Sequence, residues 1–255
     1  ELEIGGSIVV DTNPAYHAEK DRFSPYYKGR EPDPDLSPYP VIESDDSVLA
    51  YGFDLRQPVL QGEPISVALL GDIAFQNEAR GGGVGAAGEA LRILEYEAQL
   101  RFLGKNFLPS YFDTTYDRVR VERYLIYESE ETIIKAHVGW MGRIGLTVLQ
   151  ELLLLQVSAN GPFTSDTGTY PELEGVVRLR EGVVPFFSFD AFYRKLSIES
   201  FEELFEADEA VIGARLGYHS EPVLISLTYD VRYDPYDPNR QLKVTSGLQS
   251  RISLY

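Results

Sequence analysis

The chain has 255 residues and a mass of 28.7 kDa, a size that predicts one domain spanning 1–255. It contains no cysteine, which excludes a disulfide scaffold, a thiol nucleophile and a cysteine metal site. Its formal net charge of −17 argues against nucleic acid as a partner, since phosphate binding needs a basic surface.

The chain has no apolar run of about 18 residues, the length that a membrane-spanning helix needs. Its start at Glu1 rather than at a methionine is what a cleaved signal peptide would leave, and we carry that as an expectation. Tyr 17, Phe 13 and Gly 22 beside one Met and one Trp indicate a chain rich in strands and turns.

Apolar and polar residues alternate with a period of two along most of the chain, which is the pattern of half-buried β-strands. It predicts about 12 strands. In chain order they are 2–13, 46–57, 64–77, 89–104, 117–128, 132–146, 148–158, 171–181, 183–197, 209–219, 221–233 and 241–255.

Two of these segments also fit a helix. Residues 89–101 are rich in strong helix formers, and 150–156 alternate poorly. A short amphipathic helix or a turn is predicted at 201–206, inside a connection.

The connections between predicted strands alternate in length. Long or breaker-rich connections are expected at 14–45, which holds six prolines, at the glycine-rich 78–88, and at 159–170, 198–208 and 234–240. Tight turns are expected at 59–63, 181–182 and 220–221. The aromatic connector 105–116 breaks this alternation. Long loops on one rim and short turns on the other are typical of outer-membrane barrels, which places 14–45 as a long extracellular loop.

The last two predicted strands separate an apolar face from an ionic face most clearly. Extending this parity to the other strands predicts a charged set that lines the interior of a barrel: Asp54, Arg56, Asp72, Glu95, Glu97, Arg101, Glu122, Lys135, His137, Arg143, Arg178, Arg180, Asp190, Arg194, Arg215, Asp230 and Arg232. The opposite parity predicts a lipid-facing set: Tyr51, Phe53, Trp140, Phe187, Phe189, Tyr193, Ile225, Leu227 and Tyr229.

Motifs of enzyme chemistry are absent from the sequence. Only three histidines occur, at 17, 137 and 219, and none belongs to a zinc-protease motif. There is no nucleophile elbow and no phosphate loop, and the glycines of 81–88 are expected to form a flexible loop. The acidic segments lack the spacing of a calcium loop. We therefore expect no catalytic site, no metal and no cofactor.

The alternating arms, the loop asymmetry and the final strand together resemble bacterial outer-membrane β-barrels, whose last strand typically ends in an aromatic residue, here Tyr255. The resemblance implies an all-β, antiparallel, up-and-down transmembrane barrel located in the bacterial outer membrane. It also implies the lipid bilayer and the outer-membrane assembly machinery as partners, the latter through the C-terminal strand.

Three functions are compatible with this pattern. The first is a channel or porin-like protein that passes small polar solutes or ions. The second is a closed barrel that serves as an anchor or adhesion platform. The third is a soluble β-rich protein that binds a ligand in a cavity. The sequence does not name a solute or an oligomeric state.

Overall fold

The computed structural model describes most of the chain outside its long connections: residues 1–12, 14, 47–112, 123–124, 126–129, 132–148, 152–195, 198–200, 202–205, 210–220, 223–233 and 242–252. Among these residues, no helix is both long enough and apolar enough to cross a membrane.

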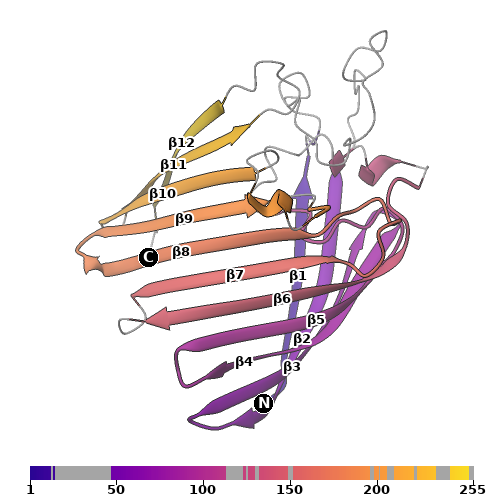
Figure 1. Ribbon diagram of the computed structural model, residues 1–255, viewed down its shortest axis with the longest axis horizontal. Helices are drawn as coiled ribbons and strands as arrows, with labels where there is room; N and C mark the ends of the chain where they lie inside the picture. The colour runs from indigo at the N-terminus through magenta and orange to yellow at the C-terminus, as the bar shows by residue number, and fades with distance from the viewer. Residues whose placement is uncertain are drawn as a thin grey trace.

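The described chain forms one sheet of 12 strands, paired in the order of the sequence (Figure 1). The strands are β1 (Glu3–Asp11), β2 (Val48–Gln61), β3 (Ile65–Gln76), β4 (Ala79–Ala90), β5 (Leu94–Leu103), β6 (His137–Val148), β7 (Leu153–Pro162), β8 (Glu172–Val184), β9 (Phe187–Lys195), β10 (Ala210–Ser220), β11 (Val223–Tyr233) and β12 (Leu242–Ile252). Each strand pairs antiparallel with the next. The prediction of an all-β, antiparallel, up-and-down sheet is confirmed.

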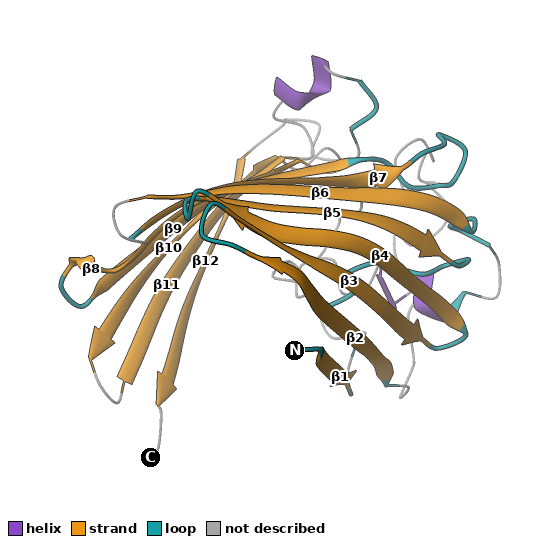
Figure 2. Ribbon diagram, turned by 90° about the horizontal axis from the view of Figure 1, so that it is seen from below, coloured by secondary structure: helices purple, strands orange, loops and turns teal. Residues whose placement is uncertain are grey.

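The sheet is strongly bent into an arch whose two arms end in β1 and β12 (Figure 2). Among the described residues, β1 pairs only with β2 and β12 only with β11. One edge of each terminal strand is therefore unpaired within the part of the sheet that the structure describes.

Two sequence predictions about individual strands are wrong. Residues 81–88, expected to be a flexible loop, lie in the middle of β4. Residues 117–128, expected to be a strand, are helical at the described positions 123–124 and 126–128. The two errors offset each other in the strand count. Glycine has a low strand propensity, which is why β4 is not recognisable in the sequence.

The glycines of β4 give room to groups from neighbouring strands. An added Cβ at Gly88 would lie 1.9 Å from the Ser66 carbonyl oxygen and 2.6 Å from the Tyr96 hydroxyl. That hydroxyl donates a hydrogen bond of 2.8 Å to the same carbonyl. The Tyr96 ring thus occupies the place that a side chain at 88 would take, so the strand relies on its neighbours for packing.

The ambiguous segments are resolved as strands. Residues 94–103 form β5 and 153–162 form β7, while 91–93 make the tight turn between β4 and β5. Within this connection the Ile93 amide donates a hydrogen bond of 3.2 Å to the Ala90 carbonyl, and the two residues between them, Leu91 and Arg92, have φ of 55° and 59°, as the central residues of a type I′ turn require. The short helix predicted at 201–206 is present as the 3-10 helix η2 (Glu202–Phe205).

With β4 in place, the connections alternate more regularly than the sequence predicts. Those after even-numbered strands are all short: 62–64, 91–93, 149–152, 185–186 and 221–222. Those after odd-numbered strands are longer, at 12–47, 104–136, 163–171, 196–209 and 234–241, with the two-residue turn 77–78 as the exception. The connector 104–136 now lies at the long-connection end, so it no longer breaks the rule.

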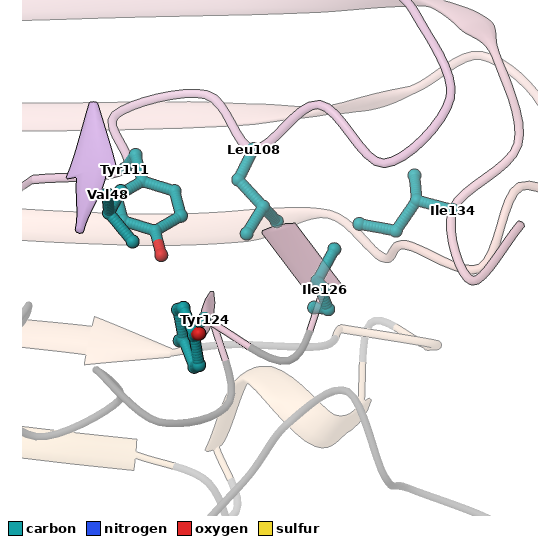
Figure 3. Packing of buried hydrophobic residues seen from close by; sticks show 6 residues of the cluster. All are labelled: Val48, Leu108, Tyr111, Tyr124, Ile126 and Ile134. Carbon is teal, nitrogen blue, oxygen red and sulfur yellow. The ribbon is translucent and has the colours of Figure 1, made fainter. Parts of the chain in front are cut away.

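A cluster of buried apolar residues in the described part of the chain is formed mainly by this connector. It contains Val48, Leu108, Tyr111, Tyr124, Ile126 and Ile134 (Figure 3). We call residues 104–136 the connector from here on. Asn106 links the beginning of the connector to its end, because the Asn106 side-chain oxygen accepts hydrogen bonds of 2.9 Å from the amides of Ile133 and Ile134.

The connector packs on the sheet through Phe107, which is 5% exposed. An added Cβ at Gly81 would lie 2.4 Å from the Phe107 ring. Gly81 therefore allows the ring to lie directly against the backbone of β4.

We predict that Gly81→Ala lowers the free energy of unfolding by about 1–3 kcal/mol, because the buried ring has to move away from the new methyl group. Gly142→Ala is the matched control, since no atom lies within 4 Å of a Cβ built there. Urea unfolding followed by circular dichroism measures both. Equal losses for the two variants would contradict the packing of Phe107 on β4.

Candidate functional site

The strand registers divide the side chains between two faces of the sheet. Directly opposed residues share a face, and successive residues alternate. Asp54 lies opposite Asp72, Glu97 opposite Arg143, and Asp190 opposite both Arg178 and Arg215. These pairs define one side of the sheet, which we call the charged face.

Fourteen of the 17 residues predicted to line the interior belong to the charged face by register. They are Asp54, Arg56, Asp72, Glu95, Glu97, Arg101, His137, Arg143, Arg178, Asp190, Arg194, Arg215, Asp230 and Arg232. Parity alone therefore places these residues together on one face of the sheet.

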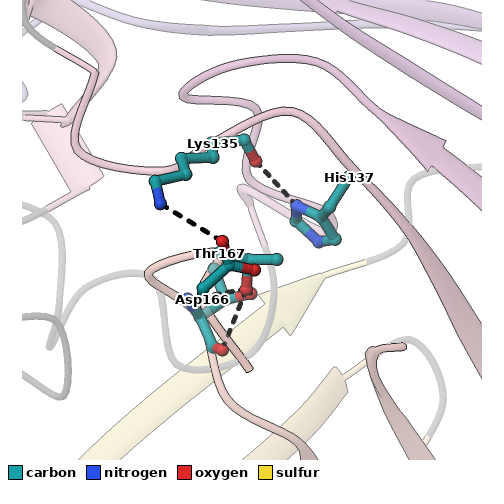
Figure 4. Close-up of polar contacts among 5 residues, drawn as sticks. Lys135, His137, Asp166 and Thr167 are labelled. Atoms are coloured by element: carbon teal, nitrogen blue, oxygen red, sulfur yellow. Dashed lines mark hydrogen bonds and ion pairs between the residues drawn. The ribbon is translucent and has the colours of Figure 1, made fainter. Parts of the chain in front are cut away.

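The three others differ. Arg180 lies at the point of β8 where the pairing with β9 shifts, between Leu179 and Val184. Glu122 lies outside the described residues. Lys135 belongs to no strand: it lies in the connector just before β6, and its ammonium is 3.4 Å from the Asp166 carboxylate in the 163–171 connection (Figure 4). The Lys135 carbonyl contacts the His137 ring at 2.8 Å. Lys135 therefore connects two long connections and does not belong to the charged face.

Cross-strand ion pairs run along the charged face. Arg56 pairs with Glu3 at 3.2 Å, Arg178 with Asp190 at 3.0 Å, and Arg194 with Glu172 at 3.2 Å. Arg143 pairs with Glu97. Opposite charges facing each other across strands stabilise a sheet modestly, by about 0.2–1 kcal/mol each. Glu3 and Glu172 were not among the predicted residues, although their parity would have identified them.

The connector covers part of the charged face. The Gln76 side chain of β3 donates to the Leu108 carbonyl at 2.6 Å and accepts from the Leu108 amide at 3.0 Å. The Arg123 guanidinium donates to the carbonyls of Ser110 and Tyr111 within the connector. These contacts hold residues 107–112 over the sheet, and the sequence offers no local signal for them.

A cavity of about 650 Å³ lies between the connector and strands β5 to β9. Charged residues from the sheet line it, among them Arg101, Arg143, Arg194 and Glu172. The connector contributes Phe107 and Arg123. His137 also lines it. The cavity therefore joins the predicted charged residues of the central strands to an aromatic segment whose role the sequence leaves open.

The opposite side of the sheet, which we call the apolar face, is exposed over its whole width. Ile4 in β1 is 76% exposed, Ile144 in β6 61% and Leu248 in β12 76%. All nine residues predicted to face lipid have this parity: Tyr51, Phe53, Trp140, Phe187, Phe189, Tyr193, Ile225, Leu227 and Tyr229. Monomeric proteins in water rarely expose a contiguous apolar surface of this extent.

Signs of catalytic or metal chemistry are few in the described part of the chain. No group of three or more histidines, aspartates or glutamates there is arranged to hold a metal ion. The Ser188 hydroxyl lies 2.8 Å from the His219 ring nitrogen on the charged face. A hydroxyl within hydrogen-bond reach of an imidazole is one part of a nucleophile and base arrangement, which also requires a third group that orients the base.

Comparison with known proteins identifies no family. No protein-family model matches the chain, and no curated protein matches it. A solved structure described as "Unveiling the Mechanism Behind the in-meso Crystallization of Membrane Proteins" contains a chain that is 11% identical, with a TM-score of 0.39. The match covers 81% of this chain and 77% of that one. At this TM-score the likeness supports no argument about function.

We predict that Gln76→Ala releases the connector from the sheet. The substitution leaves the buried amide and carbonyl of Leu108 without their partner, at about 1–3 kcal/mol for each unpaired group. Hydrogen exchange at the Leu108 amide should become faster. Gln57→Ala is the control, because the Gln57 amide bonds only the adjacent Pro58 carbonyl in the described contacts. Unchanged exchange at Leu108 would contradict the attachment.

Proposed function

We propose that the chain is a transmembrane β-barrel of a bacterial outer membrane, and that its charged face lines a path for small polar solutes or ions. The observation that carries the proposal is the exposed apolar face, which extends from Ile4 in β1 to Leu248 in β12 opposite the charged face. A bilayer supplies the apolar medium that such a face requires, and a wet interior accepts the charges.

The free energies favour this placement over a sheet in water. A fully buried valine, leucine, isoleucine or phenylalanine contributes about 1.5–3 kcal/mol relative to an exposed one. Large apolar side chains on all 12 strands are exposed in the described structure and do not gain this stabilisation. The buried apolar cluster is confined to the connector and Val48. Contact with lipid chains would recover this stabilisation.

Placement in a bilayer also requires that the sheet close. Backbone amides and carbonyls cannot remain unpaired in hydrocarbon, so the free edges of β1 and β12 have to meet. An even number of strands in an up-and-down order makes these two edges antiparallel, as in bacterial single-chain barrels. We therefore propose that β1 pairs with β12 in the membrane, and that β12 is the segment that the outer-membrane assembly machinery recognises.

The regular alternation of connections supports the same orientation. Tight turns after the even-numbered strands leave little chain to cross the membrane, as the periplasmic turns of barrels do. The longer connections, including 12–47, would then lie on the extracellular side. Because the connector covers part of the charged face, it would narrow the path without filling the cavity of about 650 Å³.

We predict that Val177→Arg destabilises the protein by about 2–4 kcal/mol in lipid, because the new charge would lie on the lipid side of β8. Val176→Arg is the matched control: it changes the adjacent residue, of the same type, on the charged face. Urea unfolding from lipid vesicles measures both. In water Val177, which is already exposed, would tolerate the charge, so equal stability of the two variants would contradict contact with lipid.

The function itself is tested by planar-bilayer recording on the purified chain. We expect discrete conductance steps, together with slower migration on a denaturing gel after boiling, since closed membrane barrels resist detergent until heated. Heat-dependent migration without conductance would support the closed anchor barrel instead. A chain that remains monodisperse in buffer without detergent would favour a soluble ligand-binding protein and would contradict the barrel.

A further inference from the structure

The cavity beneath the connector differs in charge from the chain as a whole. Its described lining contains four arginines, Arg101, Arg123, Arg143 and Arg194, against two glutamates, Glu172 and Glu174. The formal net charge of the whole chain is −17. The described lining therefore carries more positive than negative formal charge, opposite in sign to the chain as a whole.

The ion pair of Arg143 presents its positive member to the cavity. The Arg143 side chain is 47% exposed, while that of its partner Glu97 is only 8% exposed. The Glu97 carboxylate also accepts a hydrogen bond of 2.7 Å from Gln99. The guanidinium therefore covers the carboxylate and remains accessible to a solute in the cavity.

Two further arginines contribute donors to the same space. Arg101 donates to the neutral side-chain oxygen of Gln99 at 3.3 Å, and the carboxylates of Asp72, Glu97 and Glu172 lie within electrostatic range of it. Arg123 reaches the cavity from the connector side. Arginines on opposite walls place guanidinium groups around one volume, and guanidinium groups bind carboxylates and phosphates through paired hydrogen bonds.

We infer that this cavity is the selectivity site of the channel proposed above, on which the inference rests, and that it passes small anions in preference to cations. Chloride is the simplest such anion, and small carboxylates or inorganic phosphate have the groups that an arginine fork fits. Rings of arginine and lysine select anions in pores because the local potential lowers the barrier for negative solutes. The Arg194 side chain is only 12% exposed beside Glu172, against 47% for Arg143, so Arg143 and Arg101 are the main selectivity residues.

The test is the reversal potential of single channels across a tenfold gradient of potassium chloride. We expect the sign that corresponds to preferential passage of chloride. Arg143→Gln should lower the chloride to potassium permeability ratio by about 25-fold, because removing one positive charge about 4 Å from a monovalent ion in water disfavours chloride and favours potassium by about fivefold each. Arg56→Gln is the matched control, because Arg56 lies on the charged face and also pairs with a glutamate, but outside the cavity lining. Arg56→Gln should cause a smaller change in the chloride to potassium permeability ratio.

The possible outcomes distinguish failure of the anion-selectivity inference from failure of the proposed channel function. No conductance at all would overturn the channel itself. Conductance that prefers potassium, or neither ion, would overturn anion selectivity and leave the channel standing. Equal shifts for Arg143→Gln and Arg56→Gln would overturn the cavity as the selectivity site. If Arg143→Gln does not give the heat-dependent migration of the folded form, Arg101→Gln replaces it with the same expectation.

Discussion

The alternation of side chains along a paired strand is the constraint on which this protein depends. Once Asp54 lies opposite Asp72 and Arg178 opposite Asp190, alternate residues follow to the same face, up to the register shifts between Pro58 and Leu60 and between Leu179 and Val184. A slip of one residue over the whole length of two strands would exchange the faces and bring arginines among apolar side chains. Outside those two shifts, the registers of the 12 strands agree with one another, and this agreement produces an ionic surface on one side and an apolar surface on the other.

The charged face serves two purposes at the same site. Pairs such as Arg56 with Glu3 and Arg178 with Asp190 bridge neighbouring strands and neutralise charges that would otherwise repel. Where one member of a pair covers the other, as Arg143 covers Glu97, the same contact leaves a net positive group facing the cavity. Stability and selectivity in the proposed channel would then depend on the geometry of the same ion pairs.

The connector makes the central part of the sheet different from the arms. It encloses a cavity against strands β5 to β9 and contributes Phe107 and Arg123 to the lining. Its position depends on two residues of the sheet: Gly81, which has no side chain to oppose the Phe107 ring, and Gln76, which bonds both polar groups of the Leu108 backbone. The cluster of buried apolar residues around Leu108 and Tyr111 is consequently formed by this connector, with Val48 as the member that the sheet contributes.

Local pattern alone determined the fold class and the division of faces. A period of two is a property of any extended strand, so Arg215 and Ile225 could be assigned to opposite faces without knowing which strands pair. Tertiary structure decided what depends on contacts distant in sequence. Residues 81–88 form a strand because Tyr96 and Phe107 pack over glycines of low strand propensity. The described residues 123–124 and 126–128 are helical beside Val48 and Leu108 although their sequence alternates. Lys135 forms an ion pair with Asp166 and is not part of the charged face, because the connector ends beside the 163–171 connection. No local sequence pattern encodes the course of the connector.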